Sequence, residues 1–278
     1  MNAYCLLRQG PVYRREAFLK GLAAAGLNVS NHLPRRPGPE DVLVIWNRYA
    51  ENDDLARRFE LGGGRVIVAE NGYLGVGGRT HRAHDRSDRR MYALALGDHN
   101  GRGAWPAGAG RFEQLGVEVK AWRVEQGKVL VCAQRGIGSP GRGSPPSWAD
   151  QVAREIRAQL DVPVVVRPHP GDRDPEIPLE QDLAGARACV IWASGAGVKA
   201  LVEGVPVFYA CPWWVCSLGA RRYCGAGSLL MPIRNDVQRA AALERMAWAQ
   251  WTCEEISSGL PFKLLLELPV PKMEAAAA

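Results

Sequence analysis

Residues 42 to 69 read VLVIWNRYAENDDLARRFELGGGRVIVA and carry the clearest signal for the class of fold. It opens with an apolar run of strand length at 42–46, continues through a helical segment at 52–61, and returns after three glycines to a second apolar run at 65–69. Two buried strands joined by one short helix are typical of a βαβ unit, in which helices cover a parallel sheet. The stretch therefore predicts an α/β protein.

The same alternation continues on both sides of this stretch. We expect further strands at 3–7, 128–133, 162–166, 188–192 and 206–209, and further helices at 14–25, 148–160, 179–186, 196–203 and 237–259. Between 72 and 110 the pattern breaks into a segment rich in Gly, Arg, His and Asp, with one short apolar island at 91–96. Long irregular segments in α/β domains are often functional. We divide the chain into two Rossmann-like halves facing a central cleft, 1–124 and 125–278.

The charge balance suggests a partner. The chain has 278 residues, of which 47% are hydrophobic and 23% charged, and this composition excludes disordered, collagen-like and long coiled-coil proteins. Its net charge is +6, and only six of its 35 basic residues are Lys. Because Arg binds phosphate oxygens in a bidentate manner, the excess of Arg favours a phosphate-bearing partner. An Arg-rich genome composition would give the same excess.

Other sequence features exclude several classes. No apolar run reaches the about 18 residues of a transmembrane helix, and the N-terminus lacks the pattern of a signal peptide. The seven Cys are scattered, mostly in apolar stretches, as expected for reduced thiols in the cytoplasm. No Asp-x-Asp motif directly follows a predicted strand, since Asp172 and Asp174 lie farther on in a proline-rich loop. We expect neither a metal nor a resident cofactor.

Polar turns follow four predicted strands, and in open parallel sheets ligands bind beyond these strand ends. One such turn, Ser194-Gly195-Ala196-Gly197, opens a predicted helix. Its free N–H groups and the positive end of the helix dipole would suit a phosphate. A plain Ser N-cap gives the same pattern.

Two other turns carry cationic or glycine-rich groups. Arg167 and His169 are two residues apart and would point the same way from an extended chain, supplying charge and a proton to a phosphate. The alternative is a histidine satisfied by backbone groups in its loop. The turn after residue 133 would let a ligand approach the backbone, and its candidate residues are Arg135, Gly136, Gly138 and Ser139.

Glu70 follows the predicted strand 65–69, where a carboxylate could act as a general base on a hydroxyl group. A solvated carboxylate is the alternative. His99 and Asn100, beside Asp98, form a second candidate group for acceptor binding or for the base.

Taken in order, Glu70-Asn71-Gly72, His169-Pro170 and Ser194 resemble the motifs of bacterial sialyltransferases and capsule-type Kdo transferases of the GT-B fold. The stretch 194–214, SGAGVKALVEGVPVFYACPWW, is also similar to theirs. The resemblance implies that Glu70 is the catalytic base and that His169 and Ser194 contact the nucleotide phosphate. One position departs from the family, because Asn71 stands where a second acidic residue is usual. The chain is also shorter than a usual GT-B chain.

The resemblance implies a glycosyltransferase with an acceptor domain at 1–124 and a nucleotide-sugar domain at 125–278. The donor would be a UDP- or CMP-linked sugar, and we expect an inverting, metal-independent transfer. Residues 79–90, RTHRAHDRSDRR, contain five Arg and favour a polyanionic acceptor. This predicts a hydroxymethyl base in DNA, flipped out of the duplex as for phage DNA-modifying enzymes. The expected acceptor-binding residues are Asn71, Tyr73, Arg79, Arg82, Arg86, Arg89, Arg90, His99 and Asn100.

Three alternatives stay open at this point. The acceptor could be a polysaccharide or a glycolipid, with the Arg-rich segment only solvated. The chain could instead be a nucleotide-sugar epimerase of the same fold, which needs no polymeric acceptor. It could also be a nucleic-acid-binding module without catalysis.

Overall fold

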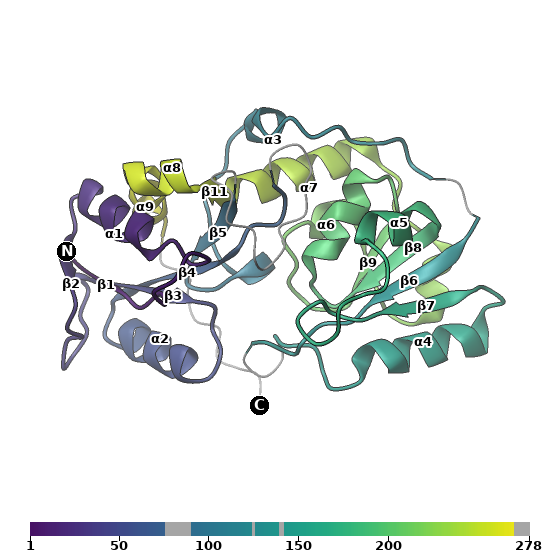
Figure 1. Cartoon of the computed structure of the whole chain (residues 1–278), viewed down its shortest axis with the longest axis horizontal. Coiled ribbons are helices and arrows are strands. Elements are labelled where there is room, and N and C mark those ends of the chain that lie inside the picture. Colours follow the sequence, from purple (N-terminus) through teal and green to yellow (C-terminus); the bar gives the residue numbers. More distant parts are fainter. Residues whose placement is uncertain (76–89, 124–125, 139–141, 270–278) are drawn as a thin grey trace. The chain divides into compact units, whose positions relative to one another are not determined.

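The computed structural model describes residues 1–75, 90–123, 126–138 and 142–269. It confirms the predicted α/β class, because strands and helices alternate and build two sheets covered by helices (Figure 1). The described chain forms two compact units. Unit 1 contains residues 1–72, 90–107 and 248–269, and unit 2 contains 73–75 and the described part of 108–247.

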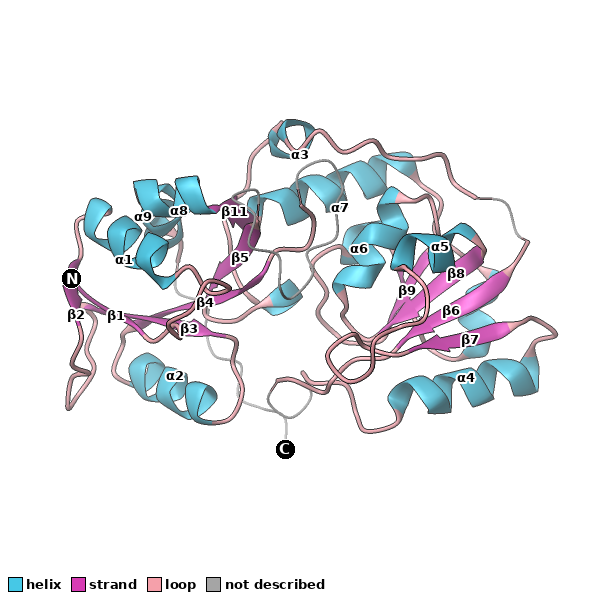
Figure 2. Ribbon diagram, viewed as in Figure 1, coloured by secondary structure: helices cyan, strands magenta, loops and turns pink. Residues whose placement is uncertain are grey.

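Unit 1 is built on a sheet in the order β11-β5-β4-β3-β1-β2 (Figure 2). Strands β1 to β4 are parallel, whereas β5 is antiparallel to β4, and β11 is antiparallel to β5. The strands are β1 (Asn2–Cys5), β2 (Asn28–Ser30), β3 (Asp41–Trp46), β4 (Arg65–Asn71), β5 (Met91–Leu96) and β11 (Gln250–Thr252). The helices are α1 (Arg15–Ala24), α2 (Glu51–Leu61), η2 (Asn100–Arg102), α8 (Cys253–Ser258) and α9 (Leu260–Glu267).

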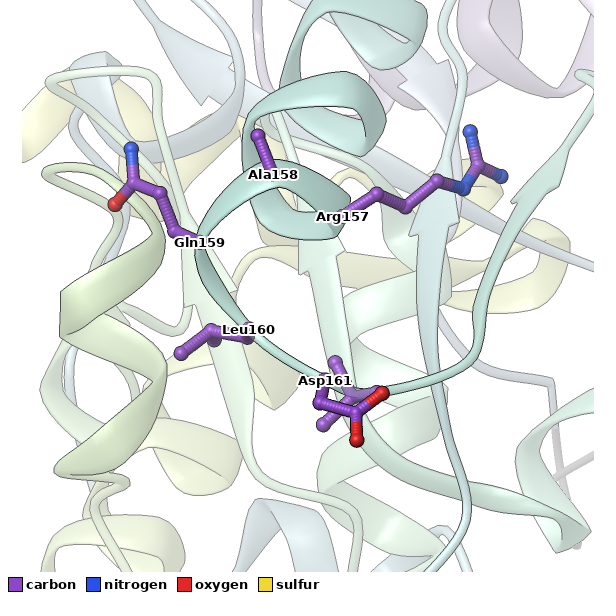
Figure 3. A pocket seen from close by; sticks show the side chains of 6 residues that line it. Arg157, Ala158, Gln159, Leu160 and Asp161 are labelled. Carbon is purple, nitrogen blue, oxygen red and sulfur yellow. The ribbon is translucent and has the colours of Figure 1, made fainter.

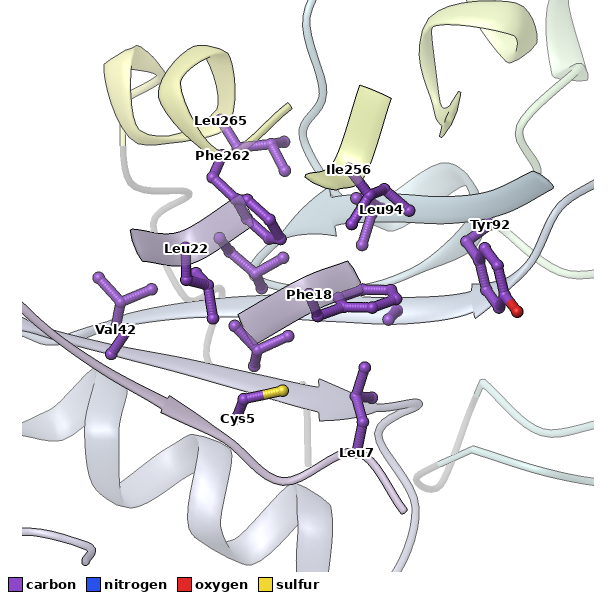
Figure 4. Packing of buried hydrophobic residues seen from close by; sticks show 14 of the residues in the cluster. Cys5, Leu7, Phe18, Leu22, Val42, Tyr92, Leu94, Ile256, Phe262 and Leu265 are labelled. Carbon is purple, nitrogen blue, oxygen red and sulfur yellow. The ribbon is translucent and has the colours of Figure 1, made fainter. Parts of the chain in front are cut away.

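The unbroken apolar run of β3 supplies two separate cores, since alternate strand residues face opposite sides of a sheet. Val42 and Val44 pack in the core under α1, α8 and α9 (Figure 4). Leu43 and Ile45 pack on the other face, against Phe59 of α2. The sheet is therefore buried on both sides, which is why the strand shows no polar alternation.

Unit 2 is built on a fully parallel sheet in the order β10-β9-β8-β6-β7. Cys132 at the end of β6 pairs with Arg167 of β7 and Ile191 of β8, so these three strands end at the same edge. The strands are β6 (Lys128–Cys132), β7 (Val164–Arg167), β8 (Ala186–Ile191), β9 (Val207–Tyr209) and β10 (Arg221–Arg222). The helices are α3 (Arg111–Gln114), α4 (Trp148–Gln159), α5 (Leu179–Ala184), α6 (Gly195–Val202), η3 (Ser217–Gly219), η4 (Ala226–Leu230) and α7 (Asp236–Trp248).

The C-terminal segment differs from the expected single helix at 237–259. Helix α7 ends at Trp248, and Gln250–Thr252 then pairs with β5 of unit 1. Thr252 caps α8 with a capping box: its side chain accepts from the backbone N–H of Glu255 at 3.2 Å, and the Glu255 carboxylate accepts from the backbone N–H of Thr252 at 2.8 Å. Trp251 is fully buried in the core of unit 1. Residues 248–269 thus pack in the first unit, whereas the sequence placed them with the second half.

The strands around Glu70 also differ from the sequence-based expectation. The island 91–96 is strand β5, and β4 runs on to Asn71. Glu70 and Asn71 therefore lie inside a strand, paired with Ala93 and Tyr92, rather than in a turn after it. Pairing with the antiparallel strand β5 extends β4 to Glu70 and Asn71, beyond the end of the apolar run of β4 at Ala69.

Candidate functional site

At the carboxyl edge of the unit 2 sheet, the turns after β6, β7 and β8 are joined to one another. The Gln134 side-chain oxygen accepts a hydrogen bond from the backbone N–H of Ala193 at 2.6 Å. The N–H of Ala133 donates to the carbonyl of Arg167 at 2.9 Å. The predicted strand-end residues of three strands therefore belong to one local framework.

His169 has a defined protonation state in this framework. Its Nδ1 accepts a hydrogen bond from the N–H of Gly171 at 2.9 Å, so the neutral ring carries its proton on Nε2. Burial lowers the pKa of His169, and the charge of Arg135 lowers it further, against an opposite effect of Asp172. At neutral pH the imidazole is thus an uncharged donor through Nε2–H, which has no partner among the described residues.

Arg135 lies beside this imidazole. Its guanidinium is about half exposed, and its Nε is 3.5 Å from an oxygen of Asp172. Gly171 allows the two groups to approach, because a Cβ at that position would lie 3.0 Å from the Arg135 side chain and 3.1 Å from His169 Nδ1. The structure therefore brings Arg135 and His169 together around one glycine.

Arg167 is instead engaged inside unit 2. Its Nη1 donates to the carbonyl of Ile177 at 2.9 Å and forms an ion pair with Asp182, whose other oxygen accepts from Lys128 Nζ at 2.6 Å. β7 ends at Arg167, and the guanidinium is taken up by Ile177 and Asp182, whereas His169 bonds to Gly171 in the turn that follows. Arg167 thus stabilises the position of β7 rather than presenting its charge at the surface.

Ser194 is the N-cap of α6. Its Oγ accepts from the N–H of Ala196 at 3.1 Å, which is the arrangement of a plain Ser N-cap. The hydroxyl proton is still available as a donor. Gly195 is exposed, and a Cβ there would meet nothing within 4 Å, so the first turn of α6 is open to a ligand.

The glycines of the β6–α4 turn adopt conformations that other residues rarely reach. Gly136 has φ of 66° and Gly138 has φ of 135°. A Cβ at Gly143 would lie 2.4 Å from the carbonyl of Gly136, so the turn folds back closely on itself. Ser139, the fourth predicted residue of this turn, lies outside the described residues.

In unit 1, Glu70 is half-buried near the end of β4, and its carboxylate forms no hydrogen bond or ion pair with a described residue. Arg90 was expected in an exposed cationic loop, but it is fully buried directly before β5. Its guanidinium donates to Asn71 Oδ1 and lies 5.3 Å from the centre of the Tyr92 ring. Tyr73 is half-buried. Arg79, Arg82, Arg86 and Arg89 lie outside the described residues.

His99 and Asn100 do not join Glu70. They follow the carboxyl end of β5, and because β5 is antiparallel to β4 this end lies near the beginning of β4, where Gly97 N–H donates to Val66. Glu70 pairs with Ala93 in the first half of β5. His99 Nδ1 is 3.3 Å from Asp98 Oδ1. The second candidate group is therefore a separate cluster.

Two features of these edges were not foreseen. Gln134 joins two turns, and its position two residues after the end of β6 was the only signal for it. Asn47 and Ala50, in the turn after β3, both have positive φ, at 52° and 50°. Asn reaches positive φ more often than most residues, whereas nothing in the sequence marks Ala50 for it. Non-glycine residues in such conformations concentrate at functional sites.

A shallow depression lies elsewhere on unit 2, where α4 ends and the chain leads into β7 (Figure 3). Its lining comes from one continuous segment, 157–162, and so brings no distant side chains together. Within the described ranges, no three His, Cys, Asp or Glu side chains are placed to hold a metal ion. The helices of the described chain include none with the length and apolar character needed to span a membrane.

The solved structures that are similar in fold to this chain include two Kdo transferases. One is the beta Kdo 2,4 transferase of Thermosulfurimonas dismutans KpsC, at a TM-score of 0.54 and 12% identity, with 90% of each chain covered. The other is the beta Kdo 2,7 transferase of the same KpsC, at 0.53 and 13%, with 93% of this chain and 98% of that chain covered. No protein-family model and no curated protein sequence matches the chain. The chain thus has a glycosyltransferase fold with two Rossmann-like halves.

Proposed function

We propose that the chain is a glycosyltransferase that moves a sugar from a nucleotide-linked donor to an acceptor hydroxyl group. The observation that carries the proposal is the group at the carboxyl edge of unit 2, where neutral His169 and cationic Arg135 lie around Gly171. A hydrogen-bond donor and a charge held together at this edge suit a phosphate. The fold of the two Kdo transferases supports the same class.

The donor phosphate would be bound by groups of unit 2. Nε2–H of His169 and the Arg135 guanidinium would donate to its oxygens, together with the Ser194 hydroxyl and the open first turn of α6. These donors would stabilise the negative charge that grows on the departing phosphate. The donor would be a UDP- or CMP-linked sugar, and the transfer would need no metal because Arg135 and the helix end supply positive charge.

Glu70 would act as the general base. Its carboxylate would accept the proton of the acceptor hydroxyl while that oxygen attacks the anomeric carbon and the bond from that carbon to the phosphate breaks. The nucleotide then leaves with the bonding electrons, and the product is inverted. The carboxylate suits this role because no described residue neutralises it.

The proposal has two versions, which differ in whether the acceptor hydroxyl belongs to DNA or to a glycan. A hydroxymethyl base in DNA rests on the Arg-rich sequence 79–90, of which the structure describes only Arg90, buried beside Tyr92. A glycan hydroxyl needs no such cationic surface. We favour the glycan acceptor, and the DNA acceptor becomes the competing outcome of the experiment.

The experiment incubates the full chain with a panel of UDP- and CMP-sugars and either oligosaccharides or hydroxymethylated DNA, followed by mass spectrometry of the products. Glu70→Gln should lose transfer by about 10²-fold or more while its nucleotide-sugar affinity stays the same. His169→Ala should lose that affinity, and His169→Gln, which keeps an N–H donor, should lose less. Full turnover in Glu70→Gln would exclude it as the base. A new sugar isomer formed without acceptor would identify an epimerase instead.

A further inference from the structure

The turn that follows β3 lies directly beside Glu70. Strands β3 and β4 are adjacent and parallel, with Trp46 paired to Ala69. The N–H of Asn47 then donates to the carbonyl of Ala69 at 3.0 Å, which continues the pairing one residue beyond β3. Residues 47–50, which we name the β3 turn, therefore begin next to the residue that precedes the proposed base.

The conformation of the β3 turn is fixed by the buried side chain of Arg48. Arg48 is 4% exposed, and its Nε donates to Asp53 at 2.7 Å. Its two Nη atoms donate to both oxygens of Glu60, at 2.6 and 3.0 Å, and Nη1 also donates to the carbonyl of Gly97 at 2.6 Å. Asn52 adds a bond from its side chain to the carbonyl of Trp46 at 2.8 Å. The turn is therefore a built and fixed element.

This fixed turn presents an aromatic ring to solvent. Tyr49 lies between Arg48 and Ala50 and is 53% exposed, the most exposed aromatic residue in the described chain. Its ring and hydroxyl contact no other ring and make no hydrogen bond among the described residues. The turn leads into α2, which covers one face of the unit 1 sheet (Figure 1). Val66 and Val68 face that same side, so Glu70, two residues further along β4, also projects toward it.

The charges around Tyr49 select the kind of ligand. Glu51 and Asp54, in the first turn of α2, are exposed and form no ion pair with a described residue. Glu70 adds a third carboxylate on the α2 side of the unit 1 sheet, and it too forms no ion pair with a described residue. Such a surface repels the phosphate backbone of a nucleic acid but accepts an uncharged ring with C–H groups on its face.

We propose that Tyr49 and the β3 turn form an acceptor subsite for an uncharged pyranose ring. The ring would stack on Tyr49 and direct a hydroxyl group toward Glu70. This inference rests on the proposed function for the role of the ligand as acceptor, but the subsite binds the sugar without any nucleotide. A sugar subsite would explain why a turn with a fixed conformation carries an exposed aromatic ring.

The experiment measures pyranoside binding alone, by saturation-transfer NMR and titration of the full chain. The probes are the methyl glycosides of glucose, galactose and mannose and, separately, a short single-stranded DNA. We expect saturation of the C–H protons of at least one glycoside. Tyr49→Ala should weaken this binding about tenfold or more, as a lost stacking contact does, while Tyr49→Trp should retain it. Leu61→Ala, at the exposed end of α2, is the matched control and should bind as the unaltered chain does.

The outcomes separate this inference from the proposed function. Glycoside binding that is equal in Tyr49→Ala and the unaltered chain, with both equally folded by circular dichroism, would overturn the subsite. Tyr49-dependent binding of the DNA and not of the glycosides would overturn the assignment of the ligand class. If the chain binds glycosides through Tyr49 but transfers no sugar from any donor, the subsite stands and the proposed function fails.

Discussion

Replacing Arg48 by Met tests how the β3 turn is stabilised. The guanidinium is buried and donates four hydrogen bonds, to Asp53, to both oxygens of Glu60 and to the carbonyl of Gly97. Methionine has a similar length but no charge, so the substitution leaves two carboxylates largely buried without this partner. Removing one member of a buried ion pair costs about 3–5 kcal/mol, because the remaining charge stays desolvated. For a chain of this size we expect a fall in Tm on the order of 10 °C.

Arg57→Met is the matched control, because Arg57 binds the other oxygen of the same Asp53, at 3.0 Å. Its side chain is 55% exposed, and an exposed pair one helical turn apart contributes at most about 1 kcal/mol. Thermal unfolding followed by circular dichroism compares the two variants. An equal loss in both would refute the reasoning that burial makes the Arg48 network strong. Adding Glu60→Gln to Arg48→Met removes one stranded charge and should restore part of the stability.

The same pair predicts a pH dependence. Burial raises the pKa of Asp53, but its bonds and charge interactions with Arg48 and then Arg57 bring it below its ordinary value of 3.8. A lowered carboxylate pKa contributes stability above the unfolded value and loses it as the pH falls through the folded value. The difference in free energy of unfolding between the unaltered chain and Arg48→Met should therefore become smaller below about pH 4. A difference that stays constant to pH 2.5 or so would contradict the role of Asp53.

Three further predictions concern other parts of the chain. Gly171→Ala should weaken nucleotide-sugar binding in calorimetry, since its methyl group would crowd Arg135 and His169, whereas Gly185→Ala, with open space, should have no effect. Trp251→Ala should destabilise unit 1 by about 3–5 kcal/mol, because it empties a fully buried site. Amide hydrogen exchange in β5 should then be faster. Unchanged hydrogen exchange in β5 would contradict the pairing of β11 with this strand. Burial lowers the pKa of His169, so the ring is neutral and the affinity for nucleotide phosphate should be constant from about pH 7 to 8. At lower pH the ring gains charge and the affinity should rise. His169→Gln should not show this rise.

Much of the fold could be predicted because burial on both faces of a parallel sheet imposes fully apolar strands. The run at 42–46 is an example, since each of its alternating sets packs in a different core. The short strand β11 could not be predicted in this way. Its three residues continue a helical spacing of apolar positions, and only the edge of β5, more than 150 residues earlier in the chain, makes them a strand.

The candidate site also contains residues that the sequence could place and residues that it could not. The strand-end rule placed Arg135 and His169 at one edge, and the structure brings them together around Gly171. The same rule could not predict Arg167, whose charge is taken up by Asp182 on a later helix. Nor could it show that Arg90 is buried beside Tyr92 rather than exposed among the other arginines.

The α/β class, the order of most elements and the strand ends at which polar groups gather can all be read from the amino-acid sequence. These follow from short-range hydrophobic pattern and from the geometry that all parallel sheets share. Which of those polar groups face a ligand, and which are paired inside the protein, depends on the folded chain. That choice depends on partners distant in sequence, such as Asp182 for Arg167 and Glu60 for Arg48. A buried charge must find such a partner, and the chain reveals the partner only when it is folded.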